Sequence, residues 1–168
     1  MYMLRLRPLK EQLSAGRLPE REGLRYVLAT FGLFAVLAEV SSRIPMTASS
    51  AENVASVASF VIFVFGSLLT YSANGGDRGT DFLGRYIALG WVLGIRVFGA
   101  MFAAIVVASV GIEISQAGSA ENEASIGLAT AIVSVLASGI FYWRLAVHIR
   151  DVAFAHNAAA LTGGNAAS

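Results

Sequence analysis

The chain contains no cysteine, and this absence removes several kinds of chemistry at once. Without cysteine there is no disulfide, no zinc or iron–sulfur site built on thiolates, and no cysteine nucleophile. Histidine is also scarce, with two residues in 168. They are His148 and His156, close together on one segment, whereas a haem in a helical bundle needs axial ligands on facing helices. We therefore expect no cofactor and no metal site.

Charged residues are equally scarce. They form 14% of the chain, against about 25% in a typical soluble domain, while 56% of the residues are hydrophobic. At about 20 apolar residues per transmembrane helix, 168 residues hold four such helices and no separate soluble enzyme domain. With a net charge of +1, the protein has no strong positive field that would favour nucleic acid. Because the chain is so apolar, the lipid bilayer is the first partner that we expect.

Four apolar stretches follow a basic N-terminal segment. Residues 1–18 space leucines along one helical face among basic residues, which is typical of a helix lying at the headgroup level; a disordered basic tail is the alternative. Pro19 suits the first position of the next helix, so the membrane domain is expected over residues 19–155. We place the spans at about residues 24–40, 54–71, 91–110 and 125–143. Residues 156–168 have nothing to pack against and are expected to be a disordered tail.

Lysine and arginine are unevenly distributed over the segments between these spans. One group lies before the first span, a second between the second and third spans, and a third after the fourth: Arg5, Arg7, Lys10, Arg17, Arg21 and Arg25; Arg78 and Arg85; Arg144 and Arg150. The two remaining connectors hold one basic residue between them, Arg43. Cytoplasmic segments of membrane proteins are enriched in lysine and arginine. We therefore expect an all-α, four-helix transmembrane bundle that runs up-down-up-down with both termini in the cytoplasm.

The third apolar stretch is too long for a membrane. From Phe82 to Ile112 it covers 31 residues, or about 46 Å of helix, against a hydrocarbon core of about 30 Å. We expect residues 81–90 to project from the membrane. Small residues in this stretch favour close helix packing and a central or oligomer-forming helix, although they are common in spans generally. They are Gly90, Gly94, Gly99 and Ala103.

The connector between the second and third spans concentrates glycine and charge. On a helix over residues 80–100, Asp81, Arg85 and Arg96 fall on one face. Together with Asn74 they form our candidate binding site for an anion or for the carboxylates of a partner. The alternative is a solvated turn, an intrahelical ion pair and an arginine that extends to the interface. The glycine spacing fits neither common nucleotide-binding loop.

A short string within this region resembles a pattern in small, uncharacterised bacterial four-span membrane proteins. The string covers about 26 of the 168 residues and reads Tyr71-x-x-Asn74-Gly75-Gly76 … Asp81-Phe82-x-x-Arg85-Tyr86-x-x-Leu89-Gly90-Trp91-Val92-x-x-Ile95-Arg96. The resemblance implies a multi-pass protein of the bacterial inner (cytoplasmic) membrane. It implies no activity.

No catalytic set is evident in the sequence. Arg144, His148 and Asp151 share a helical face, but they lack a nucleophile with an orienting partner and lack a metal. We expect a non-enzymatic accessory or interaction subunit of a membrane assembly, either a homo-oligomer or part of a larger complex.

Two other functions remain open. The first is an oligomeric small transporter or channel, with Arg96 or Glu39 along the path. The less favoured one is an enzyme acting on lipid head groups through four polar residues at the cytoplasmic face, namely Asn74, Asp81, Arg85 and His148.

Overall fold

The computed structural model describes residues 5–16, 18–43, 50–115 and 121–164. Within them the chain forms five α-helices and one short 3₁₀ helix, and no strand. The elements are α1 (Leu6–Ala15), α2 (Glu20–Arg43), α3 (Ser50–Ala73), η1 (Gly76–Arg78), α4 (Phe82–Ser115) and α5 (Glu121–Gly164). The expectation of an all-α protein is confirmed.

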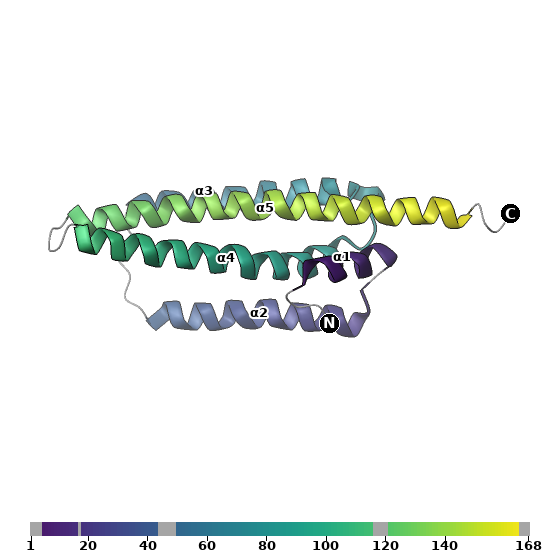
Figure 1. Ribbon diagram of the computed structural model, residues 1–168, viewed down its shortest axis with the longest axis horizontal. Coiled ribbons are helices and arrows are strands. Elements are labelled where there is room, and N and C mark those ends of the chain that lie inside the picture. Colours follow the sequence, from purple (N-terminus) through teal and green to yellow (C-terminus); the bar gives the residue numbers. More distant parts are fainter. Residues whose placement is uncertain (1–4, 17, 44–49, 116–120, 165–168) are drawn as a thin grey trace.

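The four long helices lie side by side and alternate in direction (Figure 1). α3 packs against α5, α5 also packs against α4, and α4 packs against α2. α4 therefore lies between α2 and the α3–α5 pair. The short α1 packs on α4 and α5 at the end where α4 begins. That same end also holds the connector between α3 and α4 and the last turns of α5.

Three of these helices are long and apolar enough to cross a membrane. The segments are Asn53–Ala73 in α3, Phe82–Ala108 in α4 and Ser125–Ala158 in α5. These segments overlap three of the four expected spans, and their length and apolar composition indicate a membrane protein that contacts the lipid bilayer. The remaining expected span, residues 24–40, lies within α2, which is not among the candidate spans of the described residues.

Two helices are longer than a membrane is thick. α4 has 34 residues and α5 has 44, which correspond to about 51 Å and about 66 Å of helix, against about 30 Å of hydrocarbon. α5 extends past α1 and past the start of α4 at that end of the bundle (Figure 1). Residues 82–93 of α4 and 141–156 of α5, together with residues 5–18, form what we call the head; the rest is the stem.

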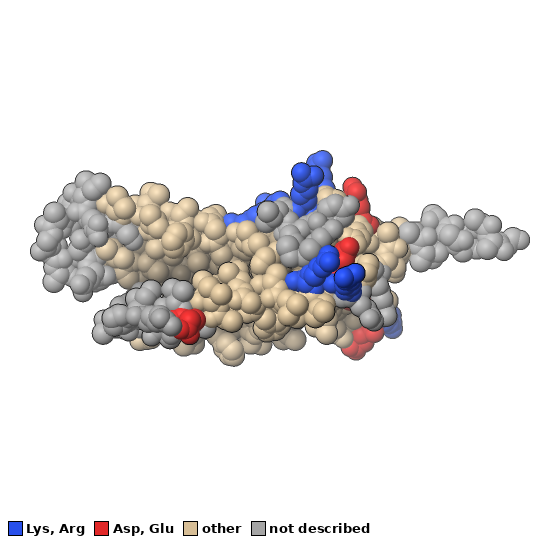
Figure 2. Space-filling model, turned by 90° about the horizontal axis from the view of Figure 1, so that it is seen from below, with Lys and Arg blue, Asp and Glu red and all other residues tan. Residues whose placement is uncertain are grey.

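The fully buried core of the protein lies in the head. Its side chains come from α1, α2, α4 and α5 and include Leu9, Leu13, Tyr26, Leu89, Val92, Leu145, Ile149 and Val152. The stem instead exposes most of its large apolar side chains, as a lipid-facing surface requires. Figure 2 shows that lysine and arginine side chains gather toward the head, whereas most of the stem surface in this view is uncharged.

The N-terminal helix differs from its expected setting. α1 is helical as the leucine spacing indicates, and Pro8 lies in its first turn, where a missing N–H group costs little. Its buried leucines, Leu9 and Leu13, however, pack into the core of the head. The apolar stripe is therefore covered by protein and not by lipid headgroups.

The C-terminal expectation also needs correction. α5 continues to Gly164, so residues 156–164 are helical and not a disordered tail. Alanine, which has the highest helix propensity, occupies positions 158–160 and favours this continuation. α2 begins at Glu20, one residue after the expected Pro19; the Pro19 carbonyl accepts hydrogen bonds from the N–H groups of Glu22 and Gly23, at 2.8 and 2.9 Å.

Candidate functional site at the junction of α3 and α4

The connector between α3 and α4 turns sharply on glycine. Gly75 and Gly76 have φ angles of 101° and 58°, a left-handed conformation that only glycine adopts without steric cost. Gly79 has a different role: a Cβ atom there would lie 2.5 Å from the Asn74 Nδ2 atom. The missing side chain lets the chain fold back over Asn74, the first residue after α3.

Arg85 and Asn74 join the two helices. The Arg85 Nη1 group donates a hydrogen bond of 2.9 Å to the Asn74 Oδ1 atom. Asn74 in turn donates from Nδ2 to the Thr80 carbonyl, at 3.2 Å. Both side chains are 2% exposed, which for an arginine is possible only with a polar partner. The pair therefore fixes the end of α3 to the first turn of α4.

Asp81 completes the cluster from the start of α4. It is the one non-glycine residue with positive φ in the described part of the chain, at 52°. Its carbonyl accepts a hydrogen bond of 3.1 Å from the Arg85 N–H group, and its carboxylate lies over Gly84, where a Cβ would come within 2.6 Å of Oδ1. A negative charge at this position is favourable, because it lies at the positive end of the helix dipole.

The cluster keeps some hydrogen-bonding capacity. The Asp81 Oδ2 and Arg85 Nε atoms are buried and have no hydrogen-bond partner among the described residues. Opposite charges one helical turn apart attract each other, which offsets part of the cost of burying them. With Arg85 covered by protein, the cluster acts as a structural connection between α3 and α4 and is closed to a ligand from solution.

The structure thus divides the four expected site residues. Asn74, Asp81 and Arg85 come together, whereas Arg96 lies on the exposed surface of α4. Eleven residues separate Arg96 from Arg85, or about 16 Å along the helix. The two arginines share a helical face, but at the level of Arg85 the connector covers that face.

A group of hydroxyls next to this cluster was not anticipated from the sequence. The Tyr86 hydroxyl lies 3.0 Å from the Ser67 Oγ atom of α3 and 3.3 Å from the Tyr142 hydroxyl of α5. Tyr86 therefore connects three long helices. A signal was present in the sequence: Ser67, Thr70 and Asn74 recur at i, i+3 and i+7 and so share one face of an otherwise apolar helix.

Polar contacts also hold α1 on α5. Lys10 Nζ lies 2.7 Å from Asp151 Oδ2 and 3.4 Å from His148 Nδ1. Four residues beyond Lys10, the Ser14 carbonyl accepts a hydrogen bond of 3.2 Å from the His156 ring. His148 is therefore engaged within the head, beside Lys10. Within the described residues no three His, Asp or Glu side chains lie close enough to hold a metal ion.

The four expected packing residues also fall into two groups. Gly90 and Gly94 face the Phe141 ring of α5, since Cβ atoms there would lie 3.9 and 3.8 Å from it. Gly99 has nothing within 4 Å of its Cβ position, and Ala103 is exposed. The first pair packs within the protein, and the second pair lies on the open surface of the stem.

No protein-family model, curated protein or solved structure matches this chain. What the protein does is therefore inferred from its own residues.

Proposed function

We propose that the protein is a non-enzymatic interaction subunit of a membrane assembly, held in the bilayer by its stem and binding its partner through the head. The observation that carries this proposal is the head itself. The three segments of the head, together with Tyr26 of α2, pack there around fully buried leucines, isoleucine and valine. Such packing gives a preformed surface outside the hydrocarbon, and a preformed surface binds with little loss of conformational entropy.

The surface of the head is basic. Arginines are exposed on it or beside it, from α1, α2, the connector and α5: Arg5, Arg7, Arg21, Arg25, Arg78, Arg144 and Arg150. Among the residues whose exposure is described, the exposed acidic residues there are fewer, namely Glu11, Asp77 and Asp151. This surplus favours an acidic segment of a partner protein, because charge complementarity steers association and sets specificity. The sequence suggested a partner-binding edge around Arg85. Because Arg85 is buried, we assign partner binding to these exposed arginines instead.

We infer that α2 is a fourth span and that the head is cytoplasmic. The side chains at positions 31–37 of α2 are all exposed, including Phe31 at 64% and Phe34. A contiguous apolar surface of this kind is covered by lipid or by another helix. The basic head then lies in the cytoplasm, in agreement with the enrichment of lysine and arginine on that side of membranes. Together with the resemblance noted in the sequence, this supports a bacterial inner membrane.

The experiment is purification in mild detergent followed by native mass spectrometry. We expect a defined oligomer or a reproducible partner, and we expect the double variant Arg144→Gln/Arg150→Gln to recover much less of it. Glu11→Gln is the matched control, because it removes an exposed charge of opposite sign from the same head. Recovery of the unaltered protein only as a lone monomer would contradict the proposal.

A second candidate function is an oligomeric small transporter or channel. The observation that favours it is the contact of Tyr86 with Ser67 and Tyr142, which places hydroxyls between α3, α4 and α5. Glu39 and Arg96 are both exposed on the outside of the monomer, where a path between subunits would run, and the hydroxyls mark a route within one chain. Solute flux into proteoliposomes that Tyr142→Phe reduces would favour this function over partner binding. Equal flux for the variant and the unaltered protein would exclude this path.

A further inference from the structure

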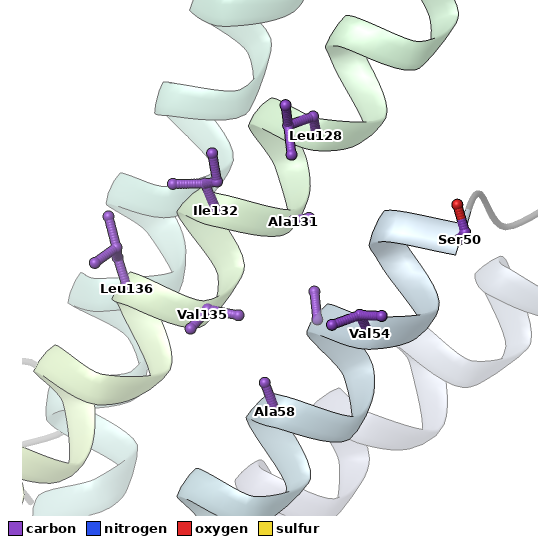
Figure 3. Close-up of a pocket in the computed structure, with 9 residues that line it drawn as sticks. Ser50, Val54, Ala58, Leu128, Ala131, Ile132, Val135 and Leu136 are labelled. Atoms are coloured by element: carbon purple, nitrogen blue, oxygen red, sulfur yellow. The ribbon is translucent and has the colours of Figure 1, made fainter.

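Two hollows flank the place where α3 and α5 touch in the stem. The larger, of about 550 Å³, is lined by apolar side chains apart from Ser50 (Figure 3). The smaller, of about 180 Å³, is lined by four residues that carry a hydroxyl and by two alanines. Ala55 and Ala131 line both hollows, so the two open on opposite sides of the contact between these small residues.

The smaller hollow, which we call the hydroxyl pocket, is built by Ser56 and Ser59 of α3 and by Thr130 and Ser134 of α5. On α5 the spacing i, i+4 and i+11 puts Thr130 and Ser134 on the same side as Phe141. Phe141 packs against α4. The hydroxyl pocket therefore opens toward the interior of the helix bundle, and the apolar groove opens outward.

Among the described residues, none of these four side chains has a hydrogen-bond partner; Ser59, Thr130 and Ser134 are half-buried and Ser56 is exposed. The hydrogen bonds of the described residues include none from their side chains; the bond that comes nearest, from Ser138 Oγ, ends on the Ser134 carbonyl at 2.9 Å. All four residues lie within the stem, inside two of the candidate spans. A hydroxyl without a partner in hydrocarbon costs about 1–3 kcal/mol by protein mutational data. Four around one pocket imply a polar occupant.

The occupant must fit both the size and the chemistry of the site. A volume of about 180 Å³ has room for several water molecules, since each takes about 30 Å³ in the liquid. A buried water needs two to four polar partners, roughly what these hydroxyls supply. No charged side chain lines the pocket, so nothing there compensates an ion.

We propose that the hydroxyl pocket is a water-binding site inside the membrane stem. Its water continues a row of hydroxyls along α5 at four-residue spacing: Thr130, Ser134, Ser138 and Tyr142. The last of these reaches Tyr86 and Ser67 near the head. Water thus occupies the hydroxyl pocket on one side of the α3–α5 contact and is absent from the apolar groove on the other side. This property is independent of partner binding by the head.

The test uses the absence of native cysteine, because any introduced cysteine is then the sole thiol. Ser134→Cys and Ser59→Cys place a thiol at the pocket; Ile132→Cys and Val57→Cys place one on outward-facing positions of the same two helices. Each variant is placed in phospholipid nanodiscs and reacted with N-ethylmaleimide, which attacks the thiolate, and a thiolate forms in water and not in hydrocarbon.

We expect both pocket cysteines to react at least about tenfold faster than their outward-facing controls, because only they ionise. Cysteine has nearly the same shape as serine, so the pocket variants should fold. The α3 pair and the α5 pair test the pocket independently, so if one variant does not fold, the other pair still gives a result. Equal slow reaction of pocket and control cysteines would show a dry pocket and overturn the proposal. Equal fast reaction would overturn it as well, because water would then not be confined to the pocket.

Discussion

Gly66 of α3 lies directly against the ring of Tyr142 of α5, so closely that a Cβ atom at position 66 would overlap the ring. The close approach of α3 and α5 at this point depends on a glycine. It brings the Tyr142 hydroxyl within reach of Tyr86 and Ser67. A single missing side chain therefore supports both the packing of α3 on α5 and the polar contacts between them.

The first prediction concerns this contact. Gly66→Ala should destabilise the protein by about 1–3 kcal/mol, the usual cost of overpacking a fitted interior. Gly94→Ala is the matched control, because its Cβ would make an ordinary contact of 3.8 Å with Phe141. Thermal unfolding in detergent, followed by circular dichroism, measures both. If the two variants unfold at the same temperature, the contact at Gly66 is not as close as described.

A second prediction concerns Arg85 and Asn74. Arg85→Met leaves the buried Asn74 Oδ1 atom without its donor, and should cost about 1–3 kcal/mol. In a double-mutant cycle with Asn74→Ala, the two changes should be coupled by about 0.5–3 kcal/mol. Denaturant unfolding measures each corner of the cycle. The exposed Arg78→Met serves as the control and should stay within about 0.5 kcal/mol. Simple additivity would mean that the hydrogen bond contributes nothing.

The third prediction separates two forces that hold α1 in place. The Lys10–Asp151 ion pair is partly exposed, with side chains 25% and 46% accessible, so it contributes about 0.2–1 kcal/mol. Burial of Leu9 contributes more, and Leu9→Ala should cost about 2–5 kcal/mol. Amide hydrogen exchange of residues 6–15 should therefore rise at least about thirtyfold for Leu9→Ala and less for Lys10→Met. The reverse order would show that charge, not packing, holds α1.

A fourth prediction tests the orientation of the helices. Single cysteines at Arg21, Thr47, Arg78 and Ala117 are treated in intact cells with a membrane-impermeant maleimide. We expect labelling of Thr47→Cys and Ala117→Cys, and labelling of Arg21→Cys and Arg78→Cys only after the membrane is opened. Position 21 lies in the first turn of α2, and position 47 follows the end of the helix at Arg43. If both were labelled from the same side, α2 would not cross the membrane.

Some of this fold is predictable from residue spacing, because spacing determines which side chains share a face. The leucine stripe of α1 and the excess length of α4 follow from the sequence in this way. The partner of a face does not follow from it. Leu9 and Leu13 have the same spacing whether lipid or protein covers them, and only the fold shows that α4 and α5 do so.

The candidate site shows the same division. That Asp81 and Arg85 are one turn apart is visible in the sequence, and Asn74 precedes a glycine turn that can fold back. The burial of Arg85 depends on how α3 approaches α4, a contact between residues from two helices. The closeness of Gly66 and Tyr142 depends on two segments 76 positions apart and has no local signal.

α5 passes from the far end of the stem through the head as one helix, Glu121–Gly164, and α4 passes likewise over Phe82–Ser115. Neither contains a proline, the commonest cause of a sharp kink. The two helices therefore behave as rigid rods, with no hinge between the stem and the head. With the stem in the bilayer as proposed, a tilt of the stem turns the basic surface of the head with it, so a change in bilayer thickness changes the direction in which that surface faces.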